Sequence, residues 1–176
     1  MQLPPWHIVE HSILSEKKWL KSIFDFGPYT HKYNDFFSVL SSDEMLRQIS
    51  IAIVSGKISA REITTSSING LWTDNANEWE LGEKEERHGG DWHRAMMNLV
   101  RKYFNKDRFE VITEPTLNWG RADLGVFKDA YQDLYVEIGT TSLFKVWFNT
   151  LTMHNVIFLY IPTTNLAIEF KTNEPT

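Results

Sequence analysis

The sequence predicts an α/β protein in which a mixed central sheet is flanked by helices, with an N-terminal helical extension. Three observations lead to this prediction. Apolar residues recur at helical spacing over residues 92–104, and three short apolar segments separated by turns follow over residues 109–138. An entirely apolar segment, residues 156–161, then comes after a further helical segment, as expected of a buried strand reached through a helical crossover.

Length and composition are those of a globular protein with one core. The 176 residues are 42% hydrophobic and 14% aromatic, which suffices for one well-buried core and a small accessory element. The net charge of −5 argues against wholesale electrostatic binding of nucleic acid but leaves room for a local basic face. The lack of cysteine excludes disulfides, iron–sulfur clusters and zinc sites with thiolate ligands. No apolar run approaches the ~20 residues of a membrane span and no signal peptide is recognisable, so we expect a cytoplasmic protein without a membrane partner.

Three helices are predicted in the N-terminal region. The first covers residues 15–26, with Ser15 as its N-cap and a Gly-Pro pair after its end. The second covers residues 42–54, opens with two acidic residues and stops before Gly56. The third starts with the sequence Ser-Ala-Arg-Glu-Ile at residues 59–63.

The second and third of these helices resemble the first two helices of a helix-turn-helix module over residues 45–63, because a short Gly-containing turn joins them. A helical hairpin packed on the neighbouring domain explains the same pattern, and residues 66–70 have little of the basic character of a DNA-reading helix. A turn-rich, charged segment over residues 73–90 is predicted to connect this helical region, residues 1–80, to a second domain over residues 88–176.

The second region alternates between predicted helices and strands in a regular order. Asp91 is expected to cap the helix over residues 92–104, and Ser142 a helix over residues 143–151. The predicted strands are residues 109–114, 121–127, 134–138, 156–161 and 166–171. The resulting element order is α-β-β-β-α-β-β.

Two acidic residues, Asp123 and Glu137, lie inside two of these apolar strands, which a short polar turn joins. Burying a carboxylate costs free energy unless it has a partner, and a divalent cation is the simplest partner for two converging acids. This hairpin is therefore the candidate site of chemistry. The structural alternative is a pair of strand-end acids that face solvent or form a salt bridge with Arg121, since strand alternation also allows opposite faces.

The element order and the two acids resemble the PD-(D/E)XK nuclease superfamily over residues 88–171. In that superfamily one metal-binding acid lies on the second strand and another on the third, usually with a lysine two positions later. Asp123 and Glu137 match the two acids, but Gly139 occupies the lysine position. Some members carry the lysine on the helix that follows the third strand. In this chain the helix predicted there, residues 143–151, contains one lysine, Lys145.

The resemblance implies a site for Mg²⁺ or Mn²⁺ bound by carboxylate oxygens. It assigns Asp123 and Glu137 as metal ligands, with Glu114 as a further candidate ligand. Lys145 is the candidate for stabilising charge on a phosphate, and His93 matches a Glu or His found near the metal in some members. The structural alternatives are a solvated helix face for Lys145 and a core histidine bonded to a carbonyl for His93.

Basic residues near the predicted hairpin are candidates for nucleic-acid binding. They are Arg121, Lys128, Arg101 and Lys102. The last two belong to a cluster around the C-terminus of the helix over residues 92–104, where the helix dipole alone favours positive charge.

The function implied by the resemblance is that of a Mg²⁺-dependent endonuclease that hydrolyses phosphodiester bonds of DNA. We expect DNA, in preference to RNA, as the nucleic acid on which it acts. The alternative is a catalytically inactive nuclease-fold domain that binds DNA or protein within a complex, because Gly139 replaces the strand lysine. A homodimer or a larger complex is compatible with the first function, since cutting both strands of a duplex commonly needs two sites.

Overall fold

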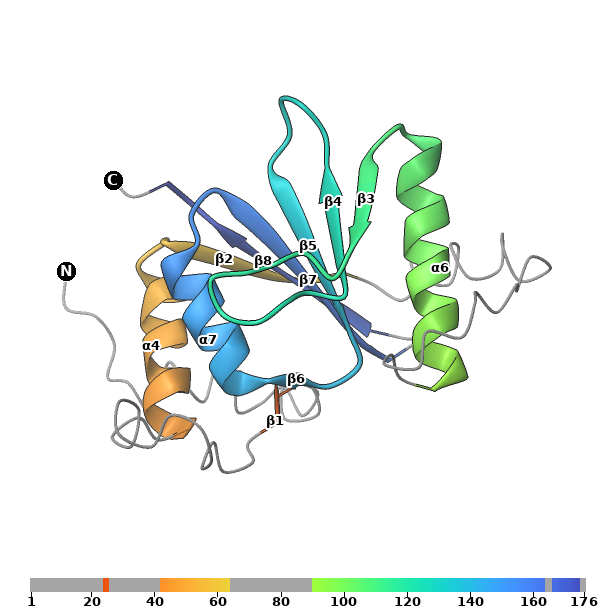
Figure 1. The fold of residues 1–176 in the computed structure, drawn as a ribbon. Helices are drawn as coiled ribbons and strands as arrows, with labels where there is room; N and C mark the ends of the chain where they lie inside the picture. Colours follow the sequence, from red (N-terminus) through yellow and green to blue (C-terminus); the bar gives the residue numbers. More distant parts are fainter. Residues whose placement is uncertain (1–23, 26–41, 64–89, 164–165, 175–176) are drawn as a thin grey trace.

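Six strands form a mixed sheet with helices on both of its faces (Figure 1). The computed structural model of the chain describes residues 24–25, 42–63, 90–163 and 166–174. The elements are, in chain order, β1 (Phe24–Asp25), α4 (Ser42–Val54), β2 (Ile58–Ile63), α6 (Asp91–Lys106), β3 (Glu110–Thr113), β4 (Leu124–Phe127), β5 (Asp133–Ile138), β6 (Thr141–Ser142), α7 (Leu143–Thr152), β7 (Val156–Thr163) and β8 (Leu166–Thr172). The order of strands across the sheet is β2-β8-β7-β5-β4-β3, and β1 pairs separately with β6.

β7 lies in the interior of the sheet, between β8 and β5. It runs parallel to β5 and antiparallel to β8, and α7 makes the connection between the parallel strands. The other pairs of the six-stranded sheet are antiparallel. The predicted mixed sheet and the predicted interior position of residues 156–161 are therefore confirmed.

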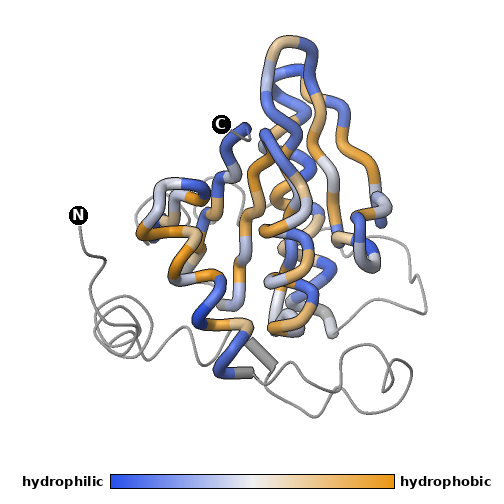
Figure 2. The backbone as a smooth tube through the Cα atoms, turned by 90° about the vertical axis from the view of Figure 1, so that its left-hand side faces the viewer, coloured by the Kyte–Doolittle hydropathy of each residue, from blue (hydrophilic) through white to orange (hydrophobic). Residues whose placement is uncertain are grey.

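Helices cover both faces of the sheet, so the buried residues form two hydrophobic clusters, one on each face. α4 and α7 pack together on one face, and α6 lies on the other (Figure 1). Phe158 belongs to the cluster that contains Ile49 of α4, whereas Leu124 and Val136 belong to the cluster that contains Met96 of α6. Hydrophobic and hydrophilic residues alternate along the helices (Figure 2), as expected when one helix face is buried. Within the described ranges, no helix is long and apolar enough to cross a membrane.

The starts of the two helices of the second region differ in their caps. Ser142 caps α7 as predicted, because its Oγ accepts a hydrogen bond from the backbone N–H of Lys145 at 3.4 Å. α6 includes Asp91 as its first residue and has Gly90 as its N-cap. The prediction that Asp91 is the N-cap was therefore wrong by one residue, within the range over which helix ends vary.

The second strand of the hairpin starts later than predicted. β4 begins at Leu124 instead of residue 121, because the preceding residues form a loop closed by an isolated bridge between Thr116 and Arg121. Asp123 therefore lies in the bend that enters β4, rather than within the strand. The predicted strands over residues 109–114 and 134–138 are present as β3 and β5.

Of the two helices predicted within residues 42–63, one is present and the other is not. α4 spans the predicted residues 42–54. Residues 59–63 are predicted as helix but lie in β2, which pairs antiparallel with β8, so residues 45–63 do not form a helix-turn-helix. The pairing is reinforced by a two-pronged hydrogen bond from Arg61 to Glu169 at 2.8 and 2.9 Å.

The remaining N-terminal predictions fall mostly outside the described residues. The helix predicted for residues 15–26 is wrong at its last turn, because Phe24 and Asp25 form β1, and its other residues lie outside the described part of the chain. The connector predicted over residues 73–90 also lies outside it, except for Gly90. The described part of the first region, α4 and β2, shares the sheet and the core of the second region.

Candidate active site

Asp123 and Glu137 lie side by side at one end of the β4–β5 hairpin. The cross-strand register pairs Leu124 with Val136, which places the residue before Leu124 next to the residue after Val136. The backbone N–H of Asp123 donates to the Val136 carbonyl at 3.1 Å, and its carbonyl accepts from the N–H of Glu114 at 3.0 Å. The predicted convergence of the two acids at one end of the sheet is therefore present.

Glu137 is an acid held inside the protein. Only 6% of the residue is exposed, and it lies opposite Tyr160 in the parallel pair of β5 and β7. Burial raises the pKa of Glu137 to about 7, the nearby Lys145 opposes that rise, and the charge of Asp123 adds to it. Glu137 is thus a carboxyl group whose charge depends on having a cation beside it.

Lys145 provides such a cation from α7. Its Nζ lies 2.6 Å from Oε1 of Glu137 and also donates a hydrogen bond to the backbone carbonyl of Arg121. The lysine therefore connects α7 with β5 and with the loop that precedes β4. The alternative of a solvated helix face for Lys145 is excluded by these contacts and by its mostly buried side chain.

Asp123 is fixed from two directions. Its Oδ2 accepts a hydrogen bond from the backbone N–H of Ile138 at 2.7 Å, and its Oδ1 lies 3.6 Å from Nε2 of His93 on α6. The interaction with the Asp123 carboxylate raises the pKa of His93 and burial opposes that rise, with smaller contributions from the Ile138 backbone and from the charge of Glu137. The predicted group Asp123, Glu137, Lys145 and His93 is thus assembled at one place, with the histidine at ion-pair distance from Asp123.

A lysine at position 139, where the resemblance leads one to expect it, would have a strained backbone. β5 ends at Ile138, and Gly139 has a φ of +89°, a conformation that glycine adopts without the strain of a side chain. Its N–H donates to the carbonyl of Ile161 at 2.9 Å, which fixes the turn on β7. Lys145, six residues further on, supplies the ammonium group that position 139 does not.

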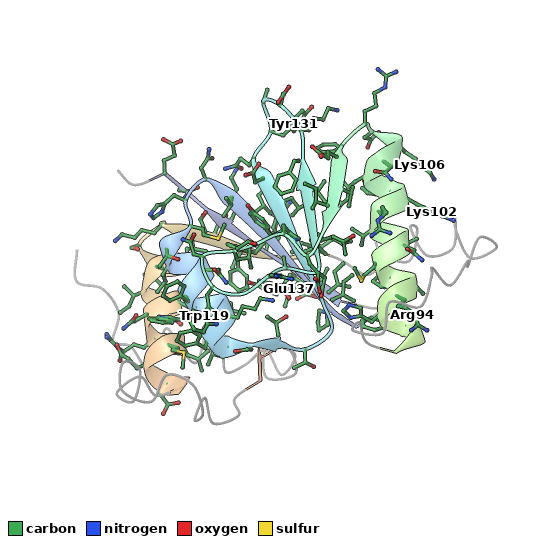
Figure 3. The ribbon with its side chains drawn as sticks, viewed as in Figure 1. Arg94, Lys102, Lys106, Trp119, Tyr131 and Glu137 are labelled. Atoms are coloured by element: carbon green, nitrogen blue, oxygen red, sulfur yellow. The ribbon has the colours of Figure 1, made fainter. Side chains whose placement is uncertain are left out.

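Glu114 and the basic residues predicted to bind nucleic acid have other partners. The guanidinium of Arg121, with a side chain that is 64% exposed, pairs with the Glu114 carboxylate at 3.2 Å. Arg101 donates to Oγ1 of Thr113 at 2.7 Å. Figure 3 shows Lys102 on α6, well away from Glu137 at the end of the sheet.

Lys128 lies at the opposite end of the hairpin from the acids. Its Nζ donates to the carbonyl of Asp107 at 2.8 Å and lies over the rings of Phe109 and Tyr131, at 4.6 and 5.2 Å from their centroids. Figure 3 places Tyr131 at the far turn from Glu137. Of the four predicted basic residues, only Arg121 lies beside the acids.

Two residues near the site were not predicted. Tyr160 is almost fully buried beside Glu137, whose charge and the burial together raise the pKa of the phenol. Asn149 on α7 is equally buried and makes three hydrogen bonds to backbone groups. The sequence offers no signal that singles out Asn149, because Thr150 beside it is also polar and buried.

The donor set fits a hard divalent cation. Two carboxylates from neighbouring strands converge, and one of them is buried enough to need a positive partner. Among the residues that the structure describes, no cluster of three or more His, Asp or Glu side chains forms a complete set of ligands. Mg²⁺ is often bound through one or two carboxylates with waters and substrate phosphates as its other ligands, which is the number of carboxylates that Asp123 and Glu137 offer.

No protein-family model, no curated protein and no solved structure matches this chain. The likeness to the PD-(D/E)XK superfamily therefore rests on the chain itself. It consists of the order α6-β3-β4-β5-α7-β7 and of the residues gathered at the end of the hairpin.

Proposed function

We propose that this protein is a metal-dependent nuclease of the PD-(D/E)XK type that hydrolyses phosphodiester bonds of DNA. The observation that carries the proposal is the contact of 2.6 Å between Lys145 and Glu137, made next to Asp123 at the end of the β4–β5 hairpin. An acid pair with an ammonium group is what the transfer of a phosphoryl group to water requires of its surroundings.

Each residue of the site has a distinct part in this proposal. Asp123 and Glu137 would hold Mg²⁺ or Mn²⁺, which when bound lowers the pKa of a water ligand and polarises the scissile phosphate. Lys145 donates hydrogen bonds where negative charge develops on the phosphate oxygens. The hydrogen bond from the Ile138 N–H fixes one oxygen of the Asp123 carboxylate, and His93 on α6 lies 3.6 Å from the other, so the carboxylate is flanked from two elements.

A second candidate function is a catalytically inactive nuclease-fold domain that binds DNA or protein. The observation that favours it is the same ion pair, because Lys145 already neutralises the Glu137 carboxylate without any metal. The two functions differ in what Lys145 does: it acts on substrate in the first and only on Glu137 in the second.

The test is a cleavage assay with single-stranded, duplex and branched DNA and with RNA, in Mg²⁺ and in Mn²⁺. Lys145→Ala should lower the rate on the best substrate by about 10²–10³, the loss typical of one electrostatic donor to the transition state. The variant should still bind Mn²⁺, since the two carboxylates remain.

Lys57→Ala is the matched control. Lys57 is exposed and precedes β2, at the outer edge of the sheet and at the end away from Glu137. Its removal should leave the rate unchanged. If the wild-type protein cleaves none of these substrates with either metal, the nuclease proposal fails and the inactive binding domain is the better reading.

A further inference from the structure

The loop between β3 and β4 is a second support for the site, and its contacts are well defined. Within it, the N–H of Leu117 donates to the Gly120 carbonyl at 3.0 Å and the N–H of Ala122 to the Pro115 carbonyl at 3.0 Å. Gly120 has a φ of +76°, and a Cβ added there would lie 3.7 Å from Cε of Lys145. The loop therefore closes on itself and passes along the lysine side chain.

Asn149 attaches this loop to α7. Its Oδ1 accepts a hydrogen bond from the N–H of Trp119 at 2.8 Å, and its Nδ2 donates to the Trp119 carbonyl at 2.9 Å. The same Nδ2 donates to the Lys145 carbonyl, one helical turn earlier, also at 2.9 Å. The side-chain amide thus pairs with both backbone groups of Trp119 much as a neighbouring strand would.

The attachment continues to the lysine ammonium. Two residues after Trp119, the carbonyl of Arg121 accepts the hydrogen bond from Lys145 Nζ, whose other contact is the Glu137 carboxylate. Asn149 and Lys145 lie on the same helix, and Asn118 of the loop also donates hydrogen bonds to Thr152 at the end of α7, at 3.2 Å to its carbonyl and to its Oγ1, so the loop is bound to α7 at three points. The two that concern the site are those of Asn149 and Lys145. One point is a buried amide and the other is the functional ammonium group.

We infer that Asn149 is a positioning residue for Lys145: it holds the loop so that the Arg121 carbonyl keeps the ammonium on Glu137. Removal of the amide breaks the two hydrogen bonds that fix the Trp119 backbone and thereby loosens the carbonyl that holds the lysine. The hydrogen bonds of Asn118 and the ring contacts of Trp119 with α7 remain. This placement of the lysine is independent of any activity, and only its consequence for cleavage rests on the proposed function. The inference explains how the ammonium group of Lys145 is held at the place where Gly139 offers none.

The test is the rate at which an amine-acylating reagent modifies Lys145 in the folded protein. The extent of modification at each time is measured by digestion and mass spectrometry. In Asn149→Ala the loss of the Arg121 contact should speed modification of Lys145 by about fivefold, the change expected for one lost hydrogen bond. Modification of Lys57 in the same sample should not change.

Thr150→Val is the matched control on the same helix. Thr150 is as buried as Asn149, but its Oγ1 bonds only to the carbonyls of Val146 and Trp147 within α7, at 2.6 and 3.3 Å. In this variant the reagent should therefore modify Lys145 at the wild-type rate, whatever the effect of the substitution on stability. Where Asn149→Ala does not fold, as judged by circular dichroism, Asn149→Ser keeps a hydroxyl and should give a smaller increase in the same direction.

Three results decide the inference. A faster rate at Lys145 alone supports it. An unchanged rate in a folded Asn149 variant overturns it, and so does an equal increase at Lys145 and Lys57, which would mean general loosening. If the protein cleaves DNA, Asn149→Ala should lower kcat with little effect on KM. If it cleaves nothing, the labelling result still decides the position of the lysine while the proposed function fails separately.

Discussion

At the scale of single residues, Glu137 is a source of pH-dependent stability. Its pKa is about 7 in the folded protein and has an ordinary value of 4.5 when exposed, so the folded state binds the proton more tightly. A group of this kind stabilises the fold fully below about pH 4.5, and the contribution is lost as the pH rises through 7. His93 acts in the same direction, because its pKa is raised as well.

Glu137→Gln should remove the part of this dependence that belongs to Glu137. Between pH 5 and pH 8 the free energy of unfolding of the wild type should fall, relative to that of the variant, by up to about 3 kcal/mol. Urea unfolding at several pH values measures it. Glu110→Gln, at an exposed position of β3, is the control for replacing a glutamate, and a difference for Glu137→Gln that does not change with pH would contradict the assignment.

Asp123 is expected to be needed for binding a divalent cation. Asp123→Ala should abolish the heat of Mn²⁺ binding in a calorimetric titration, because one of two carboxylate ligands is lost. In the wild type the affinity should fall as the pH is lowered below 7, since the proton competes with the metal for Glu137.

Asp133→Ala is the control for the titration. Asp133 is exposed and starts β5, at the end opposite Glu137, so Mn²⁺ binding should be unaffected. Unchanged binding in Asp123→Ala, in contrast, would place any metal elsewhere in the protein.

At the scale of elements, the sequence predicts those whose pattern is local. α6 and α7 have a continuous apolar stripe, and β7 is an apolar run after a helix, so each shows its own structure without reference to a partner. β2 has no such pattern. Its residues 59–62 are exposed, and only its first residue, Ile58, is fully buried, so its structure comes from pairing with β8.

The site divides in the same way. The two acids of the hairpin are recognisable because a strand and its return bring Asp123 and Glu137 to one end, and the lysine of α7 follows from the lack of one at position 139. The role of Asn149 is not predictable, because it depends on a loop whose path is set by tertiary contacts. The contacts of Arg101 and Lys128 away from the acids were not predictable either, because a sequence shows charge but not the direction of a side chain.

β4 has a position that cannot accept a side chain. A Cβ at Gly125 would lie 2.6 Å from two ring atoms of Phe127 and 2.9 Å from Cγ of Pro115, which is closer than real contacts allow. Gly125→Ala should therefore lower the free energy of unfolding by about 1–3 kcal/mol, as overpacking does. Thermal or urea unfolding measures the change.

Gly90→Ala separates steric crowding from the general effect of replacing glycine. No atom lies within 4 Å of a Cβ added at Gly90, which is the N-cap of α6 and has a negative φ. Its replacement should cost less than about 1 kcal/mol. Equal losses at the two positions would show that contact with Phe127 and Pro115 is not the reason for a glycine in β4.

At the scale of the whole molecule, α4 and β2 complete the sheet and the core of the part that carries the site. Met45 and Ile49 of α4 are buried in the cluster that contains Phe144 of α7, and β2 covers one edge of β8. A fragment of residues 88–176 lacks both elements. It should lose cooperative thermal unfolding and aggregate, because it exposes that apolar face and a strand edge.

The comparison is a fragment of residues 42–176, which keeps every strand of the six-stranded sheet. It should melt cooperatively and elute as a single species from a size-exclusion column. Cooperative melting of the shorter fragment would show instead that the nuclease-like part folds without α4 and β2.

The position of β8 has a consequence for how the protein is made. β8 lies between β2 and β7, and Arg61 of β2 bonds to Glu169 of β8, 108 residues further along the chain. A ribosome that adds about 5–20 residues per second takes roughly 5–20 s to cover that distance. Hairpins form in about 1–10 μs, so β3, β4 and β5 have time to pair while translation continues. β2, in contrast, leaves the ribosome many seconds before its partner strand exists, so the β2–β8 pair at the outer edge closes after the β3–β4–β5 part of the sheet.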